Sequence, residues 1–407
     1  MSKIKIISPV HIGSGNNYYI VYSEGNRIWT LDDALETLDS SNSHYTNFYQ
    51  SLLNERNLSR TDFISKFNLN INKLKCKEKK NNFEYYQKGK IIGNIYETSK
   101  ENDRLLIPGS TLKGYFNNVL FYDIIINNEL IRNYLMNEYK FIYEKNNEKY
   151  QNALKFKNKK ELSDISRSIE RVWNNKIENY IKDLLQFIGF RDVCFSNKVD
   201  LYEVDRYGKN NKVLPQGSYE TIPVNEEYEG NLYFNLANTS IDLMDNKIDN
   251  IKKGIDELLN KEKIKYQHHK VLINFIDEIY DRIVNFIEWF PNANRHFISN
   301  VLNYEEEFIH SINNEKIDFY KTKLFIDELK KMNNDRIILQ IGKSTNHLLK
   351  TLVMAFKEYF NKYFEIIFSP SSASIEKIKK EPRLLMMPLA KEDDLGSIML
   401  GFIEVEL

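Results

Sequence analysis

The sequence has few cysteines and histidines, the residues that cross-link small folds or bind metal ions. Only two cysteines occur in 407 residues, and Cys76 and Cys194 lie far apart and form no metal-type pair. This usage excludes a disulfide-rich secreted fold and favours a reducing compartment. We therefore expect a cytoplasmic protein.

Catalytic and metal-binding motifs are also missing. The seven histidines are scattered, and the adjacent His268 and His269 point in different directions from a predicted helix. There is no HExxH motif, no cysteine–histidine framework and no GxSxG nucleophile motif. The sequence predicts no metal site and no cofactor.

Neither an excess of one charge nor a long apolar run is present. Lys and Arg together number 57, as do Asp and Glu, so a site for a polyanion would have to be local. The longest apolar run, near Val119 to Ile126, is interrupted by Asp123 and is too short to span a bilayer. We expect no membrane association.

What the sequence does contain is a conspicuous segment at residues 105–121, LLIPGSTLKGYFNNVLF. Its first residues predict a strand and Pro108-Gly109 predicts a turn, after which Ser110 is placed to cap a helix. Unpaired backbone N–H groups, two hydroxyls and the Lys113 ammonium at the start of such a helix would suit a phosphate. A well-capped structural helix with a surface lysine is the alternative, and the segment lacks P-loop spacing.

Two further glycine-containing loops follow predicted strands. The first, at residues 8–15, follows a strand at residues 3–7 and carries His11. The second, at residues 342–347, follows a strand at residues 337–341 and precedes a helix. His11 could serve as a general acid or base on RNA, or it could be a structural histidine that closes a turn. Together the three loops, two of which carry lysine, indicate contact with an anion or a nucleic-acid backbone.

Hydrophobic periodicity predicts an α+β fold split by helical insertions. Helices are expected at residues 122–186 and 241–332, with Pro291 ending one of them and Asp32-Asp33 capping a short one. The predicted strands and hairpins lie at residues 18–31 (a hairpin), 189–195, 199–204, 217–236 (a hairpin around Gly230) and 398–407, with a polar loop at 205–211.

The three loops resemble motifs of the RAMP superfamily of CRISPR effector subunits. The motifs are SPVHIGSG at residues 8–15, IPGSTLKG at 107–114 and IGKSTNHLLKT at 341–351, with a terminal GFIEVEL preceded by Pro388-Leu389. Within that superfamily they are most similar to the fifth-subunit family of the Csm complexes of type III-A systems.

The resemblance implies a ferredoxin-like (RRM-like) RAMP core with large helical insertions. Residues 1–240 would form its N-terminal part, with insertions near 36–84 and 122–188, and residues 333–407 its C-terminal part. Residues 241–332 would be an all-helical insertion. The implied RNA-binding residues are His11, Gly13, Ser14, Ser110, Thr111, Lys113, Gly342, Lys343, Ser344 and Thr345.

There are departures from the family pattern. Asn346 stands where a second glycine is common, which would make the third loop stiffer. Backbone subunits of these complexes cleave target RNA with an aspartate in a loop after the first motif, whereas Asp32-Asp33 here is better explained as a helix cap. The resemblance therefore implies a protein that is not an enzyme.

The function implied is a non-catalytic subunit in antiviral defence. It would bind the 3′ part of the crRNA, cap the backbone filament against neighbouring Csm backbone and small helical subunits, and assist crRNA 3′-end maturation by recruiting host nucleases. Two alternatives remain. One is a metal-independent endoribonuclease of CRISPR precursor RNA with His11 as general base, and the other is a structural assembly subunit without RNA contact.

Overall fold

A computed structural model provides the fold. It describes residues 2–24, 27–30, 84–88, 94–155, 184–208, 212–235, 241–261, 266–311, 319–342, 353–359, 387–393 and 396–407. The helix expected after Asp32-Asp33 and the body of the insertion predicted near 36–84 lie outside these residues. So do residues 343–347, which make up most of the third glycine loop.

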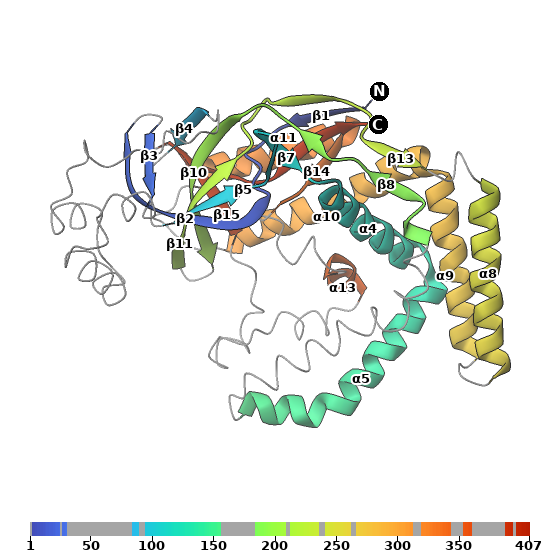
Figure 1. The fold of residues 1–407 in the computed structure, drawn as a ribbon. Coiled ribbons are helices and arrows are strands. Elements are labelled where there is room, and N and C mark those ends of the chain that lie inside the picture. The colour runs from blue at the N-terminus through green and yellow to red at the C-terminus, as the bar shows by residue number, and fades with distance from the viewer. Residues whose placement is uncertain are drawn as a thin grey trace, which may run out of the picture.

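A four-stranded sheet brings the two ends of the chain together (Figure 1). Its order is β12 (Glu227–Gly230), β1 (Ser2–Ile6), β17 (Phe402–Glu406) and β14 (Ile337–Gln340), and all neighbours are antiparallel. Alternation in β1 buries Ile4 and Ile6 while Lys3 and Lys5 lie on the other side. The predicted first strand is confirmed. The predicted last strand is two strands, because Leu400 and Gly401 separate β16 (Gly396–Met399) from β17.

An eight-stranded sheet lies beside the first one. Its path runs β16, β15 (Met387–Asp393), β10 (Lys198–Gly208), β11 (Lys212–Thr221), β5 (Asn94–Thr98), β2 (Gly13–Glu24) and β3 (Arg27–Thr30), while β4 (Glu84–Lys88) pairs with β10. β2 and β3 form the predicted hairpin around residues 25–26. The start of the expected loop at 205–211 is instead strand, since Asp205 to Gly208 pair with β11 beyond a bulge.

Two short sheets correct the prediction for residues 189–236. β6 (Lys100–Glu101), β7 (Arg104–Ile107) and β9 (Val193–Cys194) form one, and β8 (Ile188–Phe190) and β13 (Tyr233–Asn235) form the other. The strand expected at 189–195 is therefore divided between sheets. The hairpin expected around Gly230 is absent from the described residues, because β12 pairs with β1 and β13 pairs with β8.

The helices pack on the sheets as one continuous apolar core. α4 (Gly109–Asn127) and α5 (Glu129–Lys155) confirm the helical prediction for 122–186 as far as residue 155, and residues 156–183 lie outside the described residues. α13 (Val353–Tyr359) lies near α4. The helical region at 241–332 comprises α8 (Ile241–Asn260), α9 (Tyr266–Val284), α10 (Phe286–Ser311) and α11 (Tyr320–Asp335). α8 and α9 stand as a pair at one side of the molecule (Figure 1).

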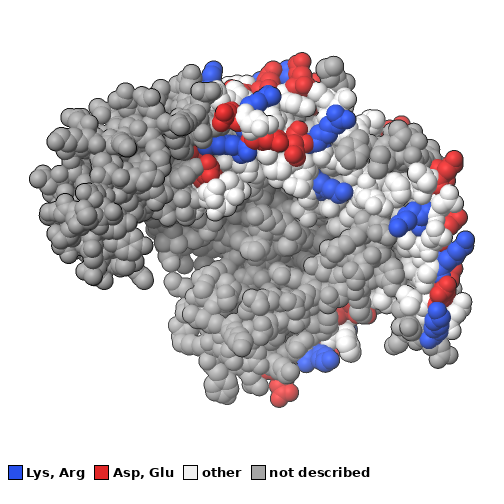
Figure 2. Space-filling view, in the orientation of Figure 1, with Lys and Arg blue, Asp and Glu red and all other residues white. Residues whose placement is uncertain are grey.

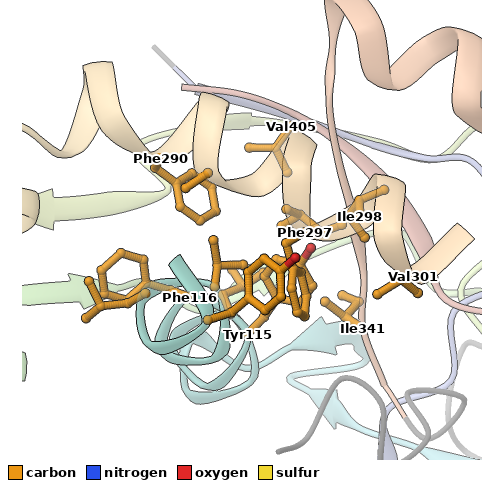
Figure 3. Close-up of a cluster of buried hydrophobic side chains, with 14 of the residues drawn as sticks. Tyr115, Phe116, Phe290, Phe297, Ile298, Val301, Ile341 and Val405 are labelled. Atoms are coloured by element: carbon orange, nitrogen blue, oxygen red, sulfur yellow. The ribbon is translucent and has the colours of Figure 1, made fainter. Parts of the chain in front are cut away.

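α10 joins this helical region to the rest of the core. Figure 3 shows Phe290, Phe297 and Val301 of α10 facing Tyr115 and Phe116 of α4, with residues of the first sheet alongside. Pro291 lies inside α10, so the prediction that it ends a helix is wrong. The proline removes a single backbone hydrogen bond near the start of the helix. The apolar residues buried on both sides of it keep the helix continuous.

A buried carboxylate also ties α4 to the helical region. Asp123 is 7% exposed and accepts hydrogen bonds from Arg282 Nε (2.8 Å), Trp289 Nε1 (2.9 Å) and Asn127 Nδ2 (2.8 Å). Arg282 is held in addition by Glu278. Because every partner is hydrogen-bonded, the charge of Asp123 is tolerated in the core, and its removal would leave the guanidinium without its main buried partner.

We expect Asp123→Ala to lower the free energy of unfolding by about 3 kcal/mol in chemical denaturation, because Arg282 Nε and Trp289 Nε1 both lose their buried acceptor. The control is Lys261→Ala, which breaks the exposed Lys261–Glu257 pair and should cost less than about 1 kcal/mol. Equal effects of the two substitutions would contradict the role assigned to Asp123.

Candidate nucleic-acid interface

The start of α4 is built differently from the sequence prediction. Pro108 is the N-cap residue, in the extended region at φ −61° and ψ 139°, and Ser110 makes no capping hydrogen bond. Ser110 is thus the second helical residue, and the prediction that it caps the helix is wrong. The cap is supplied from a distance by Asp192, whose Oδ1 accepts from the Gly109 N–H at 2.6 Å.

Gly109 is required because the backbone of Phe190 passes close to the start of this helix. A Cβ at this position would overlap the carbonyl of Phe190, in the segment that carries Asp192. The Thr111 N–H donates to the Pro108 carbonyl at 2.9 Å. A carboxylate therefore already occupies the favourable position at the positive end of the helix, so a phosphate at Gly109 would compete with Asp192.

The three predicted loops meet at one cavity of about 750 Å³. It is lined by His11 and Gly13 from the first loop, Ser110 and Thr111 from the second, and Gly342 from the third. Gly342 has a φ of +86°, and a Cβ there would overlap the carbonyl oxygen of His11. The first and third loops are therefore in direct backbone contact, an arrangement that only glycine permits at position 342.

His11 holds the first loop against the second sheet. Its side chain is 3% exposed, and Nδ1 lies 2.8 Å from the backbone carbonyl of Glu220. Since a carbonyl only accepts, Nδ1 carries the hydrogen. The imidazole also meets the ring of Tyr219 edge-on, at 4.7 Å between centroids. These contacts support the structural alternative for His11, although it also lines the cavity.

Gly13 and Ser14 lie at the start of β2, so the expected loop ends at Ile12. Ser14 Oγ donates to Glu97 Oε2 at 3.2 Å, and Asn16 Nδ2 donates to the same oxygen at 3.0 Å. Ser14 itself is not among the residues that line the cavity. Its role in this structure is to position Glu97 at the cavity wall.

The described part of the cavity wall carries no lysine or arginine side chain. Lys113 is not among the residues that line the cavity, and partial burial lowers the pKa of its ammonium. Lys343, Ser344 and Thr345 follow Gly342 in the chain and lie outside the described residues. On the face shown in Figure 2, positive and negative side chains of the described residues are interspersed.

Tyr115 connects the cavity to the core. Its hydroxyl donates to Asn294 Oδ1 of α10 at 2.7 Å, and Asn294 Nδ2 donates to the Ile338 carbonyl of β14 at 3.0 Å. Burial raises the pKa of Tyr115 well above its ordinary value, so the phenol stays neutral. This chain of hydrogen bonds fixes α4 relative to the strand that leads into the third loop.

Sequence reasoning missed several residues of the cavity, including Tyr96 of β5, Gln340 of β14, and Asn117 and Asn118 of α4. A signal for Asn117 was available. Ser110, Gly114 and Asn117 follow helical spacing on the side opposite the apolar face of Leu112, Phe116 and Val119. The contribution of Tyr96 has no such signal, because β5 reaches the cavity only through its pairing with β2 and β11.

Among the described residues, no group of His, Cys, Asp and Glu is arranged to hold a metal ion. None of the helices in those residues combines the length and hydropathy needed to cross a bilayer.

The fold of this chain is similar to the folds of proteins from type III-A CRISPR complexes. It matches a chain of the cryo-EM structure of a Csm-crRNA-target RNA ternary complex, with a TM-score of 0.54, 17% identity and 100% of both chains covered. More particularly, it matches the crystal structure of T. onnurineus Csm5, with a TM-score of 0.51, 16% identity and 99% of both chains covered. The predicted resemblance to the fifth Csm subunit is confirmed at the level of the fold. No protein-family model and no curated protein matches the sequence.

The contact between Gly342 and His11 yields a test of the cavity. We expect Gly342→Ala to lower the free energy of unfolding by about 1–3 kcal/mol, because it combines a positive φ with an overlap against the His11 carbonyl. Gly254→Ala, at an open position of α8, should instead raise it by about 0.5–1 kcal/mol. If denaturation curves show that the Gly342→Ala variant is as stable as the wild type, the close contact between Gly342 and the His11 carbonyl is contradicted.

Proposed function

We propose that this chain is an RNA-binding subunit of a type III-A CRISPR (Csm) interference complex. It binds the 3′ part of the crRNA, caps the backbone filament and assists crRNA 3′-end maturation. The observation that carries the proposal is the convergence of the three loops, identified from the sequence as RNA-contacting, on one cavity. The fold shared with T. onnurineus Csm5 and with a chain of a Csm-crRNA-target RNA complex supports it.

The core is proposed to be ferredoxin-like, as in RRM domains, with large helical insertions. In support, β7 leads through Pro108 into α4, and β14 leads through the third loop toward α13. Ser110 and Thr111 at the start of α4 and Gly342 after β14 line the same cavity. The helical region at 241–332 offers surface for neighbouring Csm backbone and small helical subunits, and we propose that host nucleases are recruited to the cytoplasmic complex.

Backbone amides and hydroxyls dominate the predicted RNA contacts, so register would be fixed by phosphate and 2′-hydroxyl groups. Local cations contribute in addition. Lys113 lies one turn into α4, two residues after Thr111 of the cavity wall, and Lys343 directly follows Gly342. Neither lysine is among the described residues of the wall. Because only these two lysines are proposed to neutralise phosphates, we expect RNA binding to depend only shallowly on salt.

Combined Lys113→Ala and Lys343→Ala substitutions should weaken binding of crRNA 3′ sequence and reduce the slope of log Kd against log salt by about one to two. Fluorescence anisotropy over a salt series measures both. Lys261→Ala, beyond the end of α8, serves as the matched control and should leave the slope unchanged. An unchanged slope in the double variant would exclude the phosphate role.

We further propose that the chain does not itself cleave RNA. His11, the candidate base of the alternative endoribonuclease, is buried and hydrogen-bonded to Glu220. Purified protein incubated with CRISPR repeat RNA in EDTA should leave the RNA intact. Specific cleavage that His11→Ala abolishes and the control His269→Ala retains would favour the enzyme. Absence of any crosslink between the chain and crRNA in the assembled complex would favour a purely structural subunit.

A further inference from the structure

The described part of the cavity wall carries no cation, and its polar side chains suit the edge of a nucleobase. Its described polar groups are mainly neutral amides, including Asn16, Asn117 and Gln340. The one carboxylate among them, Glu97, would repel a phosphate but can accept from an exocyclic amino group. The helix start nearby is occupied by Asp192, which disfavours a second anion there.

Tyr96 supplies a flat aromatic surface at this wall. Its ring stacks on that of Tyr219 at 4.7 Å between centroids and 26° between planes. Tyr219 is itself held edge-on by His11. Tyr96 is half-buried, packs on a small apolar cluster of the second sheet, and lines the cavity. The ring is thus fixed in orientation, as a stacking platform for a base requires.

Asn117 provides a polar group with unmet hydrogen-bonding capacity. Its side chain lines the cavity from α4, and its Oδ1 is buried with no hydrogen-bond partner in the described part of the chain. An asparagine amide presents two donors and an acceptor, and rotation of the amide exchanges them. A base edge in the cavity would satisfy such a group, as amides do in recognition of adenine.

We propose that the cavity receives one unstacked nucleobase of the bound RNA, stacked on Tyr96 and hydrogen-bonded through its edge by Asn117. The inference rests on the proposed RNA-binding function and adds a base contact to the backbone contacts made by the loops. The cavity of about 750 Å³ falls within the range of sites that hold small ligands. A single base with its ribose fits this volume.

The test uses the full-length chain and RNA of crRNA 3′ sequence in which each nucleotide in turn is abasic. For the wild type, we expect one position at which the abasic RNA binds about tenfold more weakly, the loss of one stacked base. Tyr96→Phe should keep this profile. Tyr96→Leu should bind intact RNA about tenfold more weakly and no longer distinguish the abasic position.

Asn117→Leu keeps the branching at Cγ, removes the amide and leaves the Tyr96–Tyr219 stack untouched, so it tests the inference even if Tyr96→Leu fails to fold. This substitution should weaken binding of the intact RNA severalfold and leave binding of the abasic RNA unchanged. A flat abasic profile with normal RNA affinity would overturn the base subsite and leave the proposed function standing. A flat profile together with tight binding of free nucleoside monophosphate would instead assign the cavity to a free nucleotide. Absence of RNA binding would overturn the proposed function itself.

Discussion

The cavity depends on how α4 is held. Phe116 lies on the buried side of the helix. Its ring contacts Phe190 of β8 and three aromatic rings of α10, those of Phe286, Trp289 and Phe290. The first N–H of α4 is held by Asp192, and its last turns are held through the buried carboxylate of Asp123. With these constraints the helix cannot rotate, so its polar stripe of Ser110, Gly114 and Asn117 must face the cavity.

Electrostatics around the cavity are consistent with the neutral composition of the chain. Lys100, three residues after Glu97 of the wall, is engaged by Glu220 at 2.7 Å and Glu97 at 3.5 Å. The described wall therefore presents amides, hydroxyls, aromatic rings and the carboxylate of Glu97. Such a surface recognises shape and hydrogen-bonding pattern more than charge, which suits a protein that fixes the register of one strand.

Local sequence predicted most single elements and several of the site residues. The first strand, the β2–β3 hairpin, the apolar face of α4, and the helices at 241–332 follow from periodicities of two and 3.6 residues. The errors concern partners that lie far away in the sequence. Ser110 loses the capping role to Asp192, the segment around Gly230 pairs with two different sheets, and Pro291 is tolerated because the helix around it is buried.

The sequence alone determined that three glycine loops follow strands and that two of them precede helices, because turn chemistry and helix periodicity are local properties. Only the tertiary structure decided that these loops share one cavity. Gly342 can contact His11 only because β14 and β1 flank β17 in the first sheet. Tyr96 reaches the wall only because β5 lies between β11 and β2. Sheet order is set by burial of side chains that are distant in the chain, and no local pattern encodes it.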